Sequence, residues 1–172
     1  NNDKVGVIFF SDKIEKFIPA QKGKTHVLHI IRELLSFEPT STGTNIAQAL
    51  QYFSNAQKRH CTVFLISDFI GIENLEKPLM IASNRHEVNA IQIYDRHDTE
   101  LPNLGLVQFR DAESGEDIWV DTSLKTIREE YAMAWTRSQN QIEQIFTRTG
   151  VKKVAVRTDA DYVKALMQLF RI

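Results

Sequence analysis

Residues 61–94, CTVFLISDFIGIENLEKPLMIASNRHEVNAIQIY, decide the fold. The stretch opens with an apolar, β-favouring run from Cys61 to Ser67, which is expected to be a buried strand and ends at Asp68. It closes with a second run of the same kind, from Val88 to Tyr94, and residues 74–83 between the two have a weak helical pattern. A strand, a helix and a strand in this order predict a parallel βαβ unit with a right-handed connection.

The sequence on either side extends this alternation and predicts a doubly wound, mostly parallel α/β sheet. Before the βαβ unit, the expected elements are a buried strand over Val5–Phe10, an antiparallel edge strand over Ile14–Ile18, a helix capped by Thr25, and a helix that begins at Ile46 after the cap Asn45. After it, a projecting hairpin is expected from the strands Leu106–Asp111 and Glu116–Asp121. The chain should then form a helix from Leu124 to Thr149 ended by Gly150, a strand over Val151–Val156 and a terminal helix capped by Asp159.

Length and composition are typical of one α/β domain over residues 1–172. A net charge of -1, from 21 basic and 22 acidic residues, gives no broad attraction for phosphate, so we expect no nucleic-acid partner. The single cysteine, Cys61, cannot form an internal disulfide and favours a reducing, cytoplasmic location. No apolar stretch is long enough for membrane insertion. The strand at Val5 follows the first residue almost at once, so we expect a piece of a longer protein.

Two polar segments are expected at one edge of the sheet. Ligands of open parallel sheets bind outside the carboxyl ends of the strands, where the segments Ser41–Asn45 and Ser67–Asp68 should meet. Hydroxyl and carboxylate oxygens are donors that Mg²⁺ prefers, so Thr44 and Asp68 are the candidate metal ligands. The alternative is structural: Thr44 would cap a helix and Asp68 would accept backbone hydrogen bonds.

Other polar residues give weaker signals. His26 and His29 have a spacing that metal ligands can use, but no third ligand is near them in sequence. A further group, His86, Asp95, His97 and Asp98, is expected as a polar loop at the end of the strand that finishes at Tyr94. No Gly-x-Ser-x-Gly elbow and no Walker phosphate loop occurs, and no catalytic residue is assigned.

Several motifs carry a family resemblance. The run Gly43-Thr-Asn-Ile-Ala-Gln-Ala-Leu50, followed by Val63-Phe-Leu-Ile-Ser-Asp68, resembles the threonine loop and the aspartate strand of von Willebrand factor type A domains. More narrowly, residues 3–11, the Ser-Asp-Phe ending at Phe69, Glu100-Leu-Pro102 and residues 105–115 are similar to a bacterial family called domain of unknown function 58.

The resemblance implies a six-stranded, Rossmann-like sheet with a metal-ion-dependent adhesion site, and a MoxR-type AAA+ ATPase as partner. In it Thr44 and Asp68 would help to hold a divalent cation, with magnesium as the expected ion, directly or through water. The family's other ligands lie in an Asp-x-Ser-x-Ser motif on its first, central strand, and this sequence has no such motif. Asp121-Thr-Ser123 has the wrong pattern, so those ligands are not transferred to it.

These observations predict a non-enzymatic protein-binding module with a partial metal site. Thr44 and Asp68 alone supply too few charged oxygens to hold a cation tightly, so we expect no tightly bound metal in this chain. Without the central strand, the strands at Val5–Phe10 and Cys61–Ser67 are expected to pair directly or to form a homodimer through their unpaired edges. The alternatives are a metal-dependent α/β hydrolase-like enzyme and a structural scaffold with a dead metal site.

Overall fold

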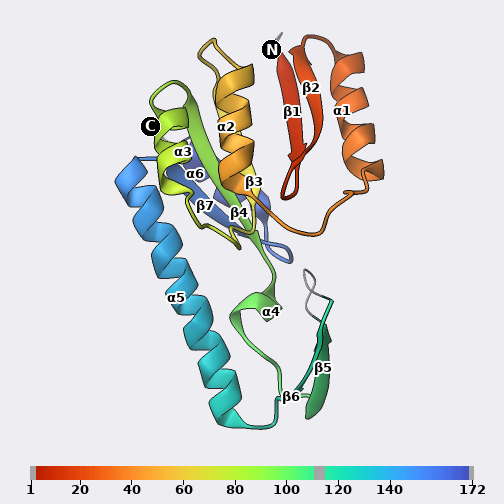
Figure 1. Ribbon diagram of the computed structural model, residues 1–172, viewed down its shortest axis with the longest axis vertical. Helices are drawn as coiled ribbons and strands as arrows, with labels where there is room; N and C mark the ends of the chain where they lie inside the picture. Colours follow the sequence, from red (N-terminus) through yellow and green to blue (C-terminus); the bar gives the residue numbers. More distant parts are fainter. Residues whose placement is uncertain (1–2, 111–114, 171–172) are drawn as a thin grey trace.

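The computed structural model describes residues 3–110 and 115–170 and has the predicted mixed α/β character (Figure 1). Its elements are β1 (Val5–Phe10), β2 (Ile14–Gln21), α1 (Lys24–Ser36), α2 (Ile46–Ala56), β3 (Thr62–Ser67), α3 (Glu76–Ser83), β4 (Glu87–Tyr94), α4 (Arg96–Thr99), β5 (Leu106–Arg110), β6 (Asp117–Asp121), α5 (Lys125–Thr149), β7 (Lys152–Arg157) and α6 (Tyr162–Leu169).

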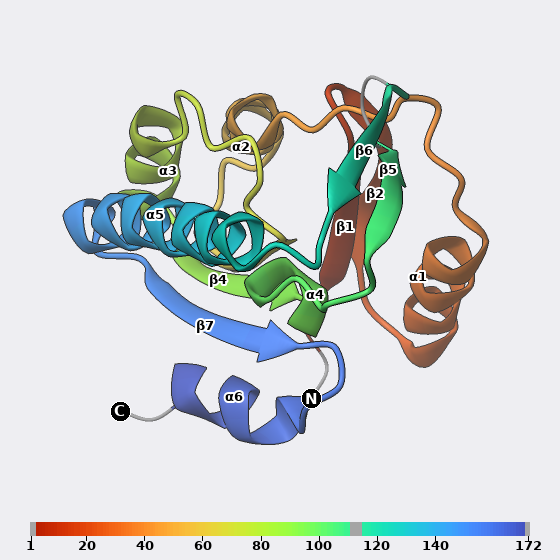
Figure 2. The same ribbon diagram turned by 90° about the horizontal axis from the view of Figure 1, so that it is seen from below.

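A parallel sheet in the order β3-β4-β7 forms the centre of the fold. The strand, helix and strand that residues 61–94 predict are β3, α3 and β4, and this part of the expectation is confirmed. Helices α2, α3 and α5 cover one face of the sheet, and α6 covers the other (Figure 2). A parallel sheet with helices on both faces is compatible with Rossmann-like folds.

The larger core lies between this sheet and α2, α3 and α5. Its fully buried members include Leu79 on α3, Ala90 on β4 and Ile142 on α5. A smaller cluster on the other face joins Ile91 and neighbouring residues of β7 to Leu169 on α6. The hydrophobic stripes of the helices and the alternate residues of the strands therefore account for both clusters.

The strands β1 and β2 form the predicted antiparallel hairpin. Gly6 allows the two strands to approach closely, because a Cβ at this position would lie 2.8 Å from the backbone nitrogen of Ala20. Helix α1 lies beyond the hairpin, on the side away from the parallel sheet (Figures 1 and 2). It contacts the hairpin through an ion pair between Glu33 and Lys16 and a bond between His26 Nε2 and the Val5 carbonyl, 2.9 Å long.

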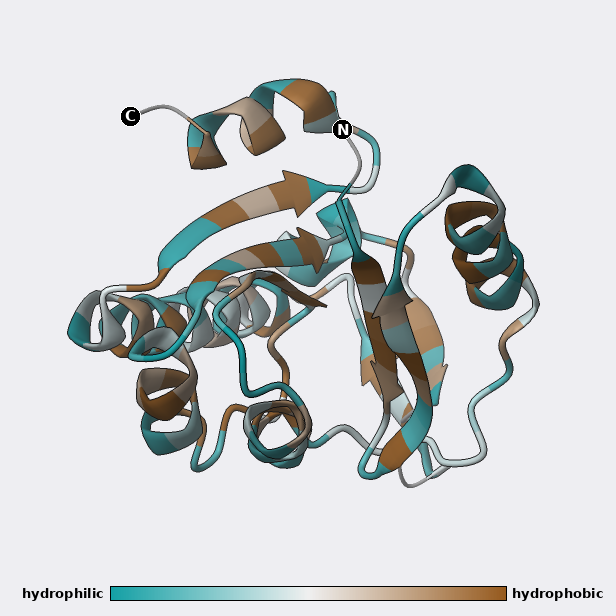
Figure 3. Cartoon of the chain, turned by 90° about the horizontal axis from the view of Figure 1, so that it is seen from above, coloured by the Kyte–Doolittle hydropathy of each residue, from teal (hydrophilic) through white to brown (hydrophobic). Residues whose placement is uncertain are grey.

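No hydrogen bonds join β1 to β3 within the described residues, so the expectation that these strands pair directly is wrong. The hairpin stands beside the parallel sheet as a separate two-stranded unit (Figure 3). The expectation that both strands are buried is also wrong. Val5 is 41% exposed, Phe64 43% and Ile66 57%, because each strand has an open edge and the segment that covers this face of β3 does so only in part, through Phe170 against Phe64.

The second hairpin, β5–β6, projects away from the parallel sheet as predicted (Figure 1). Its base is fixed by the fully buried Thr122, whose Oγ1 donates to the Gly105 carbonyl and accepts from the Leu104 amide, both at 2.8 Å. The turn predicted between the strands falls mostly outside the described residues. Gly115, which borders it, has φ 73°, a conformation that favours glycine.

Two helix ends match the sequence analysis and two do not. Asn45 Oδ1 accepts from the Gln48 amide at 2.9 Å, and Gly150 ends α5 in the left-handed conformation, as predicted. Helix α1 is preceded by Gly23 instead of the expected Thr25. Helix α6 is capped by Asp161, whose Oδ1 accepts from the Val163 amide at 2.9 Å, instead of by Asp159, which forms an ion pair with Arg157.

Candidate metal site at the carboxyl edge of the sheet

The first helical turn of α2 is held against the turn between β1 and β2. The Asn45 amide donates to the Ser11 carbonyl at 2.8 Å, so the start of α2 is tied to the end of β1. Gly43 lies against the same turn, since a Cβ built on it would be 3.4 Å from the Cβ of Asp12. Thr44 is therefore placed at the carboxyl end of β1 by its two neighbours.

Thr44 also adjoins the loop that follows β3. Its carbonyl oxygen lies 3.7 Å from the position that a Cβ would occupy on Gly71, three residues after Asp68. The Thr44 side chain is exposed, and among residues 3–110 and 115–170 its hydroxyl has no hydrogen-bond partner. The fold thus brings the segments that carry Thr44 and Asp68 to the same edge of the molecule.

Asp68 follows the last residue of β3 and is exposed. Its Oδ1 accepts a hydrogen bond from the Ile70 amide at 3.0 Å. One carboxylate oxygen of Asp68 therefore serves the backbone, which was the alternative to a metal-binding role. In the described part of the chain no hydrogen bond engages Oδ2. The Asp68 carbonyl accepts from Nε2 of the fully buried Gln92 at 3.3 Å, and this bond anchors the loop to β4.

A polar network that the sequence analysis missed supports the threonine loop. Glu15 Oε1 accepts from Ser11 Oγ at 2.7 Å and from the Thr40 amide at 3.1 Å, while Oε2 accepts from Thr40 Oγ1 at 2.7 Å. These bonds, chiefly the hydroxyl bonds from Thr40 and Ser11, hold the pKa of Glu15 below its ordinary value. The loop of residues 40–45 is thus fixed to β2 at one end and to β1 at the other.

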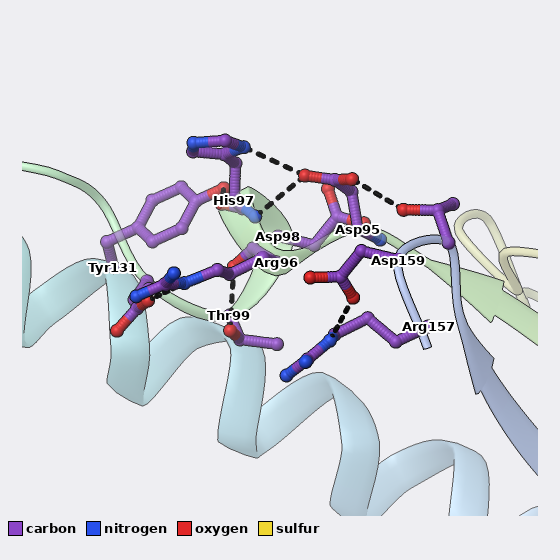
Figure 4. Close-up of polar contacts among 10 residues, drawn as sticks. Asp95, Arg96, His97, Asp98, Thr99, Tyr131, Arg157 and Asp159 are labelled. Atoms are coloured by element: carbon purple, nitrogen blue, oxygen red, sulfur yellow. Dashed lines mark hydrogen bonds and ion pairs between the residues drawn. The ribbon is translucent and has the colours of Figure 1, made fainter. Parts of the chain in front are cut away.

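The end of β4 carries the polar cluster shown in Figure 4. Asp95 accepts from the His97 amide at 3.0 Å and from Thr158 Oγ1 at 2.6 Å, and its Oδ1 lies 2.8 Å from His97 Nδ1. These bonds, led by the His97 amide, hold the pKa of Asp95 well below its ordinary range. Asp98 completes a capping box by accepting from the Asp95 amide at 2.6 Å. The cluster joins the carboxyl ends of β4 and β7, as expected for these polar residues, but His97 and Asp98 belong to the short helix α4 and not to the expected loop.

His86 does not belong to this cluster, and its expected place there is wrong. It precedes β4 and therefore lies at the opposite, amino edge of the sheet, 3% exposed, with Nδ1 3.5 Å from Cys61 Sγ. Burial raises the pKa of Cys61, so its thiol is poorly reactive, as expected. Burial, followed by the nearby charges of His60 and Arg85, lowers the pKa of His86.

We expect His86 to make the domain sensitive to acid. Its folded-state pKa lies below the unfolded value, so the stability that the neutral ring contributes is present above the unfolded pKa and is lost as pH falls through the folded pKa. When the pH is lowered from neutral into the range where histidine becomes protonated, the free energy of unfolding should therefore fall less for the His86→Gln variant than for the wild type. Urea unfolding across that range measures the difference. Equal slopes for the two proteins would contradict a role for His86. His29→Gln, at an exposed ring on α1, serves as the control.

The described residues contain no group of three or more histidine, cysteine, aspartate or glutamate side chains arranged to hold a metal ion. Two open cavities, of about 420 and 480 Å³, are present, the first lined by residues of α4 and the segment after it and the second by residues of α2, α3 and the segment before α3. Neither Thr44 nor Asp68 lines them. The candidate ligands therefore lie on an exposed rim and not within either cavity.

Comparison with known proteins gives the family but no activity. Residues 1–141 match the family described as "Protein of unknown function DUF58". The chain is 27% identical over 170 residues to an uncharacterized protein of Mycobacterium tuberculosis, which covers 96% of this chain. An uncharacterized protein of Mycobacterium avium is 27% identical over 158 residues, covering 90% of this chain and 92% of that protein. The chain spans 53% of the Mycobacterium tuberculosis relative, about half of its length.

Solved structures agree at the level of fold. The chain aligns with the conserved hypothetical protein BatB from Bacteroides thetaiotaomicron over 99% of its own length and 78% of that chain, with TM-score 0.57 and 18% identity. An aerotolerance-related membrane protein from Bacteroides fragilis gives TM-score 0.58 and 18% identity over 98% of this chain and 79% of that one. Within the described part of this chain, every helix is too short or too polar to cross a bilayer. The match over residues 1–141 shows that the chain belongs to the DUF58 family of proteins of unknown function.

Proposed function

We propose that this domain is a non-enzymatic protein-binding module whose carboxyl edge uses a divalent cation to engage a partner. The observation that carries the proposal is that the Thr44 backbone lies against the loop that follows Asp68, while the exposed Thr44 hydroxyl has no hydrogen-bond partner among the described residues. Both side chains are hard oxygen donors and are exposed, so a partner's acidic side chain could reach a cation bound there. A cytoplasmic location, expected from the lone Cys61, is part of the same proposal.

Thr44 and Asp68 have the oxygen donors that magnesium prefers, and they would form two members of a larger set of ligands. Thr44 and Asp68 would hold the ion directly or through water, and the ion would supply an open coordination position for a carboxylate. One carboxylate and one hydroxyl give too little charge for tight binding, so the remaining ligands must come from outside these residues. The 172-residue chain alone is therefore expected to bind magnesium weakly.

We further propose that an additional strand lies between β1 and β3 in the longer protein and carries the missing ligands. Both strands have open edges toward this position, and Phe10 on β1 already packs against the core that contains Leu65 on β3. Phe64 and Ile66 lie on the face of the sheet that α6 covers only in part, as the Phe64–Phe170 ring contact shows. A strand followed by a helix on that face would pair both edges and cover these side chains.

A second copy of the chain is the other possible occupant of this position. The homodimer would pair β1 or β3 of one copy with an open edge of the other. Sedimentation of the chain with and without the longer protein's preceding segment separates the two cases. A dimer that becomes a monomer when the segment is present supports the inserted strand, whereas a dimer in both forms supports pairing between copies.

The partner in this proposal is a MoxR-type AAA+ ATPase, which the family resemblance implies. The test is capture of the ATPase by the longer protein, with magnesium and with chelator. We expect chelation, Thr44→Ala and Asp68→Asn each to weaken capture by roughly 10- to 100-fold, the usual scale for lost metal-site contacts. Thr126→Ala, at an exposed threonine on α5, should have no effect.

The outcomes also separate the alternative functions. If neither the chelator nor the two site variants changes capture of the ATPase, the domain is a structural scaffold with a dead metal site. Magnesium-dependent turnover of an ester substrate that Asp68→Asn abolishes would instead identify a hydrolase-like enzyme. Isothermal titration of the longer protein with magnesium alone gives a readout that does not depend on the choice of partner.

A further inference from the structure

The β5–β6 hairpin presents a face that nothing in the described chain covers. Alternate residues of a strand point to the same side, and directly paired residues of antiparallel strands share a side. The register pairs Leu106 with Asp121 and Gln108 with Trp119, so these side chains share one face. Trp119 is 62% exposed and Leu106 is 66% exposed. We call this surface, with Arg110 and Asp117 at its far end, the Trp119 face.

Charge is distributed unevenly along the Trp119 face. Trp119 lies between Asp117 and Asp121, each two residues away on β6 and therefore roughly 7 Å distant along the strand. Arg110 stands opposite Asp117, whereas Asp121 stands opposite the apolar Leu106. The Asp121 carboxylate accepts from the amide and hydroxyl of Ser123 at 2.9 and 2.6 Å. Asp121 is thus a fixed negative charge beside an exposed indole and an exposed leucine.

This combination favours a cation next to an apolar group. A guanidinium or ammonium over an indole is attracted by the negative face of the ring, and a carboxylate within reach adds a charge-assisted bond. Exposed tryptophan is also the side chain that most often dominates the binding energy of protein interfaces. An isolated two-stranded hairpin is only marginally stable, so covering this face would stabilise it as well.

We propose that the Trp119 face binds a protein segment that carries an arginine or lysine beside an apolar side chain. The cation lies over Trp119 and against Asp121, and the apolar side chain lies on Leu106. The Trp119 face shares no residue with the cation site at Thr44 and Asp68, and the β5–β6 hairpin is a sheet of its own, so this binding does not require that site. A partner with an acidic segment is disfavoured, because Asp117 and Asp121 would repel it.

The experiment uses the 172-residue chain with Trp135→Phe, which leaves Trp119 as its single tryptophan. The probes are acetyl-Leu-Arg-Leu-amide and acetyl-Leu-Gln-Leu-amide, followed by Trp119 fluorescence and by the NMR shift of its indole N–H. We expect the arginine peptide to bind roughly three- to tenfold more tightly than the glutamine peptide. Asp121→Asn should remove this preference, Trp119→Leu should weaken binding of the arginine peptide as judged by backbone amide shifts of β5, and Asp3→Asn should change neither result.

Three outcomes would overturn the proposal. Equal affinity for the two peptides would show that the cation plays no part, and no response to either at about 10 mM would show that the face is not a peptide site. A blue shift of Trp119 on addition of phosphatidylcholine vesicles without peptide would identify a lipid surface as the occupant instead. Circular dichroism of Asp121→Asn establishes that a lost preference does not come from unfolding, and Asp117→Asn supplies a second test on the same strand.

Discussion

Phe69→Ala is expected to lower the free energy of unfolding by about 3–5 kcal/mol, the usual cost of removing a large aromatic side chain from a core. Phe69 is 1% exposed, and its ring meets that of Phe146 edge to face with centroids 5.2 Å apart. The residue has φ 58°, an uncommon conformation for a bulky side chain, so tertiary packing holds it in place. Alanine would keep the unfavourable φ and lose the packing.

Urea unfolding followed by circular dichroism measures this change. Phe17→Ala is the matched control, because Phe17 is 42% exposed and its removal should cost far less. A loss below about 0.5 kcal/mol for Phe69→Ala would contradict the described packing, because changes that small are typical of surface substitutions. Because Phe69 follows Asp68 directly, the variant should also weaken magnesium-dependent capture in the longer protein.

Gln92→Leu is expected to destabilise the domain by about 1–3 kcal/mol, although leucine has nearly the same volume. Gln92 is fully buried, donates to the Asp68 carbonyl at 3.3 Å and accepts from Lys153 Nζ at 3.2 Å. Leucine would leave both groups without this partner in a largely dry environment. The loop that carries Asp68 would lose its anchor to β4.

A double-mutant cycle isolates the polar contribution. Adding Lys153→Met to Gln92→Leu removes the largely buried cation that the first change deprives of its Gln92 partner, so the double variant should recover part of the lost stability. The Lys153 side chain is only 13% exposed, and its remaining partner is Glu143 at 3.4 Å. Additive losses in the two single variants would contradict the coupling between Gln92 and Lys153.

The strands and helices followed from the sequence because each prediction used local information. Two apolar, β-favouring runs located β3 and β4, a weak helical pattern between them located α3, and Gly150 located the end of α5. Burial of β1 and β3 did not follow, because it depends on which strands lie beside them and not on their own composition. The apolar sequence of β3 does not indicate whether a neighbouring element covers Ile66, which is exposed in the structure.

The candidate site was predictable only in outline. Placement of Thr44 and Asp68 at one edge followed from the rule that strand ends converge in parallel sheets. The bond from Thr158 to Asp95 and the anchoring of Thr40 by Glu15 join residues far apart in sequence, and no local pattern marks them. His86 was assigned to the wrong edge because its place relative to Glu87, the first residue of β4, was not used.

The pairing of β4 with β7 has a kinetic consequence. Residues 95–151, which include the projecting hairpin and the long helix α5, separate the two neighbours in the chain. Closing so large a loop has a high entropic cost, whereas β3 and β4 are linked by the short connection through α3. Folding should therefore begin in residues 61–94, with α5, β7 and α6 docking afterwards as a slower step of high contact order.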